Sequence, residues 1–140
     1  MRHSAYRRIA GFTLLELLVV IVIIGLLAAY VAPRYFAQVG KSEVQVARAQ
    51  IDALEKALDQ YRLDMRRYPS TEQGLQALVA RPAGEASWNG PYLRKAVPLD
   101  PWGNPYVYRN AGSGDDVEIL SYGRDGRPGG SELDADIANR

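Results

Sequence analysis

Cysteine is absent from this chain of 140 residues, and histidine occurs only once, as His3. A chain without cysteine forms no disulfide and no thiolate metal site. With His3 as its one histidine and no cysteine, the chain lacks the residues for most nucleophile–base pairs and zinc sites. Asp100, Asp115 and Asp125 supply carboxylates, but no pair of acids stands in a pattern typical of catalysis. We therefore do not expect an enzyme.

Charged side chains are also missing from a long stretch near the N-terminus. Residues 12–32 form an apolar run of 21 residues with one acidic side chain, Glu16. A helix of this length spans about 31 Å at about 1.5 Å per residue, which matches the apolar core of a bilayer. A carboxylate costs at least about 2.5 kcal/mol there, so Glu16 is expected to have a functional partner.

The residues that flank this run indicate its orientation. Arg2, Arg7 and Arg8 precede it without any acid, so residues 1–11 are expected in the cytoplasm and the bulk of the chain outside. The alternative is an ordinary secretory signal peptide cut after the run. For a cut after Ala32, Tyr30 occupies a position at which the cleavage motif needs a small residue. Pro33 would directly follow the cut, which also disfavours that alternative.

Net charge gives no indication of a nucleic-acid partner. The whole chain carries a formal charge of +1, and without the three arginines above it has 14 basic and 16 acidic residues. Nucleic-acid binding domains usually carry a clustered excess of basic residues.

A second helical pattern follows Pro33, which should itself kink the helix or loosen the turn before it. Apolar residues recur at alternating spacings of three and four, with charged residues between them. The stripe consists of Val44, Ala47, Ile51, Leu54, Leu58, Tyr61 and Met65. It covers only about three heptads and is rich in alanine, so packing on the rest of the domain is favoured over a coiled coil. Residues 12–65 are then one long helix.

The remainder of the chain predicts a small antiparallel sheet. Residues 70–73 form a capping box that should open a short helix through about Val79. A loop rich in glycine and proline follows, with Trp88 and Tyr92 as anchors onto the helix. Turn residues at 100–105, strands at 106–109 and 117–122 and a hairpin loop at 110–115 complete the pattern. The expected fold class is α+β, with the long helix packed against the sheet.

An acidic, glycine-rich loop at residues 125–136 has two interpretations. It is either a solvated loop or a set of oxygen ligands for Ca²⁺. An EF-hand is excluded, because Arg127 and Gly129 occupy the third and fifth positions counted from Asp125.

The sequence Gly11-Phe12-Thr13-Leu14-Leu15-Glu16 resembles the signal of the type IV pilin-like superfamily. The resemblance implies that a prepilin peptidase cuts between Gly11 and Phe12 and that the new N-terminus at Phe12 is methylated. Glu16 would then neutralise the terminal ammonium of a neighbouring subunit in a filament. Glu16 and Pro33 are our candidate assembly residues.

Further stretches resemble the major pseudopilin family of the type II secretion system, core protein G. They run in family order at residues 61–64, 67–75, 100–106, 121–126, 129–130 and 135–137. The resemblance implies a pseudopilin fold and a calcium ion on the C-terminal loop. The candidate ligands are the carboxylates of Asp125 and of Asp134 or Asp136, with Ser131 and the carbonyl of Tyr122. Family members often carry a tryptophan after the last of these stretches, where this chain ends at residues 138–140.

The family also implies a domain plan and a function. Residues 1–11 would be a cytoplasmic leader, residues 12–32 a transmembrane and assembly helix in the inner membrane, and residues 33–140 a periplasmic domain. The chain would be the structural subunit of a homopolymeric pseudopilus that drives folded proteins across the outer membrane. Minor pseudopilins, the prepilin peptidase and the inner-membrane secretion platform would be its partners. A type IV pilin or a minor pseudopilin is the alternative, although pilins commonly have a disulfide that this chain cannot form.

Overall fold

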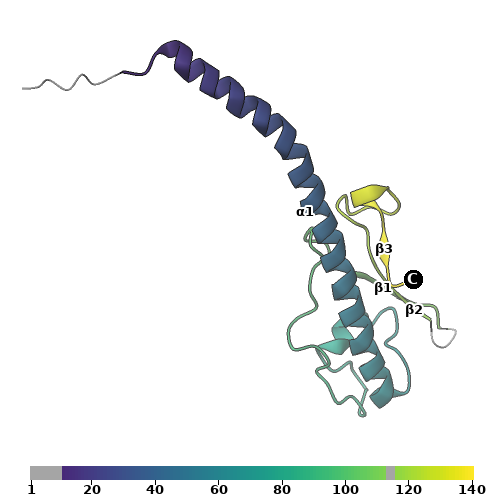
Figure 1. The fold of residues 1–140 in the computed structure, drawn as a ribbon. Helices are drawn as coiled ribbons and strands as arrows, with labels where there is room; N and C mark the ends of the chain where they lie inside the picture. Colours follow the sequence, from purple (N-terminus) through teal and green to yellow (C-terminus); the bar gives the residue numbers. More distant parts are fainter. Residues whose placement is uncertain (1–10, 113–115) are drawn as a thin grey trace, which may run out of the picture. The chain divides into compact units, whose positions relative to one another are not determined.

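The computed structural model describes residues 11–112 and 116–140 (Figure 1). The predicted leader therefore lies outside the described residues except for Gly11, and so does part of the predicted hairpin loop. Contacts divide the chain into two units, residues 1–38 and 39–140, which are described separately. The element order is α1 (Leu14–Met65), the 3₁₀ helix η1 (Leu75–Leu78), β1 (Val107–Asn110), β2 (Val117–Ser121), the 3₁₀ helix η2 (Glu132–Asp134) and β3 (Ile137–Ala138).

Helix α1 is the long helix that the sequence predicts. Thr13 caps its start, because the Glu16 amide donates to Thr13 Oγ1 at 3.2 Å. The helix continues without interruption through Gly25 and Pro33 to Met65. Pro33 therefore does not end the helix, and its effect on the preceding turn stays a prediction.

The core of the second unit forms on the predicted apolar stripe of α1. Within that stripe Ala47, Ile51, Leu54, Leu58 and Tyr61 are buried, while Val44 and Met65 are partly buried against the same cluster. Side chains from η1, from the strands and from Tyr106 just before β1 cover them: Leu75, Ala77, Leu78, Tyr106, Tyr108, Val117, Ile119 and Ile137. The stripe packs on the rest of its own domain, as predicted.

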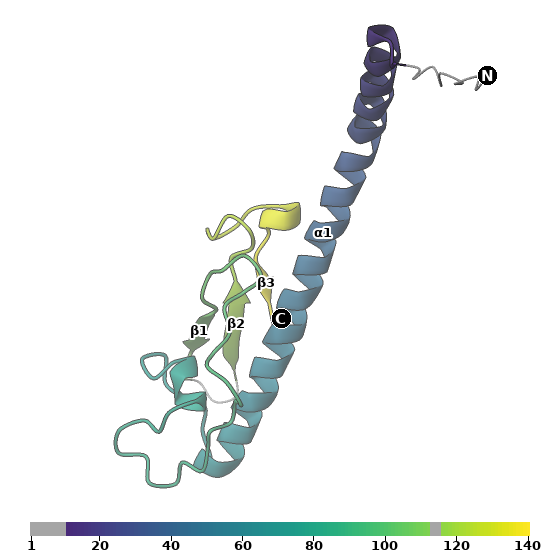
Figure 2. The ribbon, with the colours of Figure 1, turned by 90° about the vertical axis from the view of Figure 1, so that its left-hand side faces the viewer.

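The sheet has three antiparallel strands in the order β1-β2-β3. Tyr108 pairs with Ile119 across the predicted hairpin, and Ser121 pairs with Ile137 on the other side of β2. In Figure 2 the three strands lie side by side along the C-terminal part of α1. The sequence analysis missed β3, because two residues carry too little pattern to indicate a strand.

The predicted capping box is present, but the segment after it is not an α-helix. The Gln73 amide donates to Ser70 Oγ at 3.2 Å, and the Ser70 amide donates to Gln73 Oε1 at 2.9 Å. Gly74 then adopts a φ of 58°, a left-handed conformation that an α-helix cannot contain. The chain forms a turn followed by η1 instead of the predicted helix through Val79.

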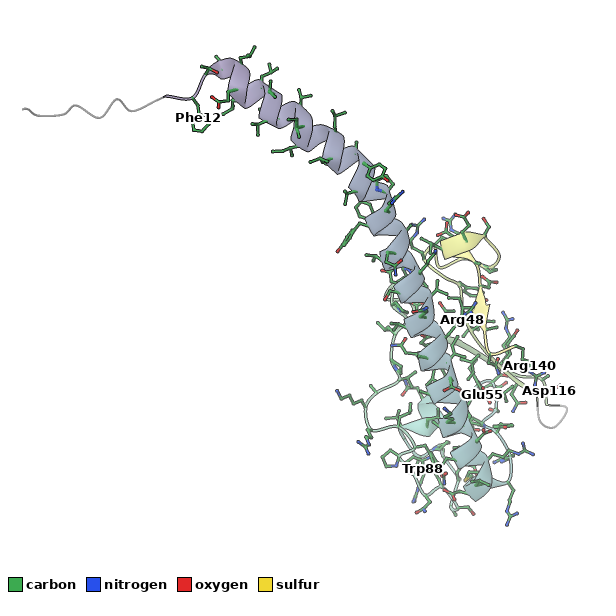
Figure 3. The ribbon with its side chains drawn as sticks, viewed as in Figure 1. Phe12, Arg48, Glu55, Trp88, Asp116 and Arg140 are labelled. Atoms are coloured by element: carbon green, nitrogen blue, oxygen red, sulfur yellow. The ribbon has the colours of Figure 1, made fainter. Side chains whose placement is uncertain are left out.

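The two predicted aromatic anchors lie against the core. Trp88 donates from Nε1 to the Ala77 carbonyl at 2.8 Å (Figure 3). The Tyr92 hydroxyl donates to Asp64 Oδ2 at 2.8 Å, and its ring meets that of Tyr61 edge to face. The Tyr92 contacts attach the irregular segment between η1 and β1 to α1, and the Trp88 contact attaches it to η1.

Candidate assembly and metal sites

The bond between Gly11 and Phe12 lies just before the first turn of α1. Residues 11–13 belong to no helix or strand. Among the described residues, no neighbour lies within 4 Å of a Cβ built on Gly11, and Phe12 is 82% exposed (Figure 3). A protease binds its substrate in an extended form, so a bond outside the helix is open to cleavage. The Phe12 side of the predicted processing site is exposed, and cleavage there stays a prediction.

Glu16 lies in the first turn of α1, at the third position after the cap Thr13. A carboxylate in this position is stabilised by the unpaired amides and the dipole of the helix N-terminus. Cleavage after Gly11 would leave the ammonium of Phe12 four residues before Glu16. The first turn would then hold one positive and one negative group at the edge of an apolar surface.

The apolar side chains after Glu16 are exposed along the helix. Residues 17–36 form a continuous exposed set that includes Leu17, Val20, Ile24, Leu27, Val31 and Phe36. Among the described residues, α1 is long and apolar enough to cross a membrane, judged by length and composition. An exposed surface of this size requires lipid or other protein chains as its surroundings.

The acidic loop at residues 125–136, together with residues 122–124 before it, is closed by contacts of its own. Asp125 Oδ1 accepts a hydrogen bond from the Arg127 amide at 3.1 Å, and both carboxylate oxygens of Asp136 accept from the Gly129 amide. Asp134 Oδ1 lies 3.1 Å from Arg124 Nε. The five candidate ligands, Tyr122, Asp125, Ser131, Asp134 and Asp136, therefore belong to one closed loop.

Two glycines allow this loop to close. Gly123 and Gly130 have φ values of 69° and 92° and both lie against the backbone of Asp134. A Cβ at Gly123 would stand 2.8 Å from the Ala135 carbonyl oxygen, and one at Gly130 would overlap the Asp134 carbonyl. Only glycine fits at either position.

The loop has the ligand chemistry for calcium. Calcium takes oxygen ligands from carboxylates, carbonyls and hydroxyls, and Ser131 Oγ makes no capping hydrogen bond to η2. Among residues 11–112 and 116–140, however, no three acidic or histidine side chains converge as a metal site. A calcium ion would thus need hydroxyl and carbonyl ligands beside its carboxylates, and Asp134 is already paired with Arg124.

Two buried residues near this loop escaped the sequence analysis. Asp100 is 4% exposed and Ser121 is fully buried, and Ser121 Oγ donates to Asp100 Oδ2 at 2.5 Å. The Asp100 turn was recognised as turn chemistry, but its partner lies 21 residues away, so no local pattern could indicate the contact.

The chain terminus is also fixed in a way that the sequence did not indicate. Asn139 donates from Nδ2 to Glu55 Oε1 at 3.1 Å, and its Oδ1 accepts from the Ile119 amide at 3.1 Å. The Arg140 guanidinium donates to Asp116 Oδ1 at 2.5 Å and thereby lowers the pKa of that carboxyl (Figure 3). The Asn139 contacts attach the last residues of the chain to β2 and α1.

Comparison with known proteins decides the family. Residues 34–140 match the family model "Type II secretion system (T2SS), protein G". The chain belongs to the protein G family of the type II secretion system. Residues 6–32 match a second model, the prokaryotic N-terminal methylation motif. Both parts of the predicted resemblance are therefore confirmed.

Members of the protein G family in other bacteria cover nearly the whole chain. The type II secretion system core protein G of Pseudomonas aeruginosa is 47% identical over 136 residues, which cover 95% of this chain and 96% of that protein. The core protein G of Vibrio cholerae is 44% identical, with 95% and 92% covered. This similarity favours the major pseudopilin over the alternatives of a type IV pilin or a minor pseudopilin.

The fold is similar to that of a solved pseudopilin. The crystal structure of the major pseudopilin from the type 2 secretion system of enterohaemorrhagic Escherichia coli matches with a TM-score of 0.57 and 43% identity. The match covers 71% of this chain and 87% of that one. The predicted fold, a long helix on a small antiparallel sheet, is thus the pseudopilin fold.

Proposed function

We propose that this chain is the major structural subunit of a periplasmic pseudopilus in a type II secretion system. The observation that supports this most is the pairing of a protein G domain at residues 34–140 with an exposed apolar helix that begins beside Glu16. Such a helix is suited first to a bilayer and then to the core of a filament. The role is mechanical and needs no catalytic residue.

Processing precedes assembly in this proposal. The prepilin peptidase cuts between Gly11 and Phe12, on the cytoplasmic side of the inner membrane, and the Phe12 amine is methylated. The chain is then anchored by residues 12–32 with residues 33–140 in the periplasm. The position of the Gly11–Phe12 bond outside α1 supports cleavage at this bond.

In the proposed filament, Glu16 aligns neighbouring subunits by pairing with the terminal ammonium of the next chain. In lipid, an unpaired ammonium at Phe12 and an unpaired carboxylate at Glu16 are each costly. In a filament, the carboxylate of one subunit meets the ammonium of the next, and removing either partner leaves a buried charge that costs several kcal/mol. Minor pseudopilins and the inner-membrane secretion platform are the expected partners for starting and extending this polymer.

Calcium on the C-terminal loop is the second part of the proposal. Asp125, Asp136, Ser131 Oγ and the Tyr122 carbonyl are the oxygens that we assign to it. Asp136 is preferred to Asp134, because the Asp134 carboxylate is paired with Arg124. The ion would add to the exposed hydrogen bonds that Asp125 and Asp136 make within the loop.

Export from the source bacterium tests the function. Deleting the gene should leave the proteins that this secretion system exports inside the cell, and a wild-type copy should return them to the medium. A Gly11→Val copy should fail, because it blocks cleavage and leaves the leader on the helix. Normal export without the gene, or full rescue by the Gly11→Val copy, would contradict the proposal.

A further inference from the structure

Asp100 is a buried carboxylate with a complete set of partners. Its Oδ1 accepts from the amides of Trp102 at 3.1 Å and Asn104 at 2.7 Å. Its Oδ2 accepts from Ser121 Oγ at 2.5 Å, inside the domain. Taking a carboxylate out of water is costly, and the first two bonds explain only the shape of the turn at residues 100–104.

The third bond, from Ser121 Oγ, connects Asp100 to the start of the acidic loop. Ser121 Oγ donates to Asp100 and accepts a hydrogen bond from the Gly123 amide at 3.2 Å. The Gly123 carbonyl accepts from Asn104 Nδ2 at 3.5 Å. Residues of the turn therefore hold Gly123, through Ser121 on its amide side and directly on its carbonyl side.

The planar peptide bond between Tyr122 and Gly123 links the orientation of the Gly123 amide to that of the Tyr122 carbonyl. The Gly123 amide and the Tyr122 carbonyl belong to one rigid peptide plane. An amide held by Ser121 Oγ on one side fixes the direction of the carbonyl on the other. Tyr122 is the residue whose carbonyl we assign to calcium.

The turn itself is attached to α1. Trp102 donates from Nε1 to Glu43 Oε2 at 3.1 Å. Leu133, on the far limb of the loop, packs on Gly40 of the same helix. Both limbs of the loop are therefore positioned from α1 by buried or half-buried side chains.

We propose that Asp100 and Ser121 are positioning residues for the calcium loop, which orient the Tyr122 carbonyl through the Gly123 amide. The inference rests on the calcium part of the proposed function. Groups that orient metal ligands without touching the metal typically change affinity by about ten- to a hundredfold when they are removed. A purely structural role would lower stability and leave calcium affinity unchanged.

Calorimetry separates the two roles. Calcium chloride is titrated into the detergent-solubilised full chain as wild type, Ser121→Ala and Asp100→Asn. Ser121→Ala removes the acceptor of the Gly123 amide and should raise the Kd by about tenfold or more. Asp100→Asn can still accept from the turn and donate to Ser121, so it should raise the Kd less. Asp52→Asn, an exposed residue paired with Lys56 on α1, should not change it.

Each outcome decides the matter. A folded Ser121→Ala variant with the wild-type Kd would overturn the positioning role and leave the calcium proposal standing. If that variant does not fold, Asp100→Asn decides instead, and a folded Asp100→Asn variant with the wild-type Kd would overturn the positioning role. No binding of calcium by the wild type would overturn both proposals at once.

Discussion

Leu133 packs directly on Gly40 of α1, and there is no room for a side chain between them. A Cβ built on Gly40 would overlap both methyl groups of Leu133 and stand 3.2 Å from its Cγ. Gly40 is also buried, because Leu133 of the loop covers the helix backbone at this position. This contact attaches the acidic loop to the helix that the pseudopilus would use for assembly.

The first prediction concerns this contact. Gly40→Ala should displace the loop, because overpacking costs about 1–3 kcal/mol. Alanine gains about 1 kcal/mol in helix propensity over glycine, so the net loss of stability should be smaller than the overpacking cost. Adding Leu133→Ala should restore part of the loss. Thermal melting and protease cleavage in the loop measure both effects.

Gly25→Ala is the matched control, because a Cβ at this helical glycine meets nothing within 4 Å. It should keep or slightly raise the melting temperature. A Gly40→Ala variant as stable as Gly25→Ala, with an equally resistant loop, would show that the contact does not position the loop.

The second prediction concerns the end of the chain. Asn139→Ala should leave the amide of Ile119, a fully buried residue, without the Asn139 Oδ1 acceptor and so cost about 1–3 kcal/mol. The Glu55 carboxylate would lose its donor as well. Arg140→Ala is the control, since its exposed ion pair with Asp116 should contribute nothing measurable. Equal melting temperatures for the two variants would contradict the role of Asn139.

Local patterns predicted most of this fold. The apolar stripe of α1 repeats over several turns, the Ser70–Gln73 box is a fixed four-residue motif, and the hairpin strands alternate between turn signals. Each is a property of neighbouring residues, so the sequence displays it directly. Gly74 adopts a left-handed conformation, so a 3₁₀ helix follows the capping box in place of the predicted α-helix. The direction that the chain takes there depends on tertiary contacts, which the sequence does not display.

Contacts between distant residues were not predictable from one sequence. Asp100 and Ser121, Gly40 and Leu133, and Asn139 and Glu55 are brought together only by the finished fold. Strand β3 is missed for the same reason, since its two residues are strand only because β2 lies beside them. The first two pairs lie beside the acidic loop or contact it. The composition of the loop could therefore be recognised from the sequence, whereas the residues that contact it could not.

The third prediction is a loss of stability in alkali. Burial raises the pKa of Tyr106 and Tyr108 well above their ordinary range. Above about pH 10 the unfolded chain loses these protons while the folded chain retains them, so the free energy of unfolding falls as pH rises. Tyr108→Phe should make that fall less steep, although it also removes a hydrogen bond to the Pro69 carbonyl.

Melting temperatures at a series of pH values measure this slope. The wild type measured over the same pH series provides the reference slope. If the Tyr108→Phe variant loses stability in alkali as steeply as the wild type, burial of Tyr108 is not the cause of the loss.

The fourth prediction separates processing from assembly. Glu16→Leu should be cut after Gly11 and inserted into the membrane like the wild type, because the open bond before α1 does not involve Glu16. Filament formation should fall strongly, since the ammonium of the next subunit would lose its partner in an apolar environment. Filaments counted by electron microscopy should be few, with a normal amount of cleaved subunit in the membrane. Wild-type filament numbers would remove Glu16 from assembly.

The central claim is that this chain polymerises as a processed pseudopilin. The most direct measurement is the mass spectrum of filaments sheared from cells that produce the chain with its secretion system and prepilin peptidase. We expect filaments made mainly of one chain that begins at Phe12 and carries one methyl group on its terminal amine. Filaments that lack this chain, or a chain that still begins at Met1 or begins at Pro33, would contradict the account.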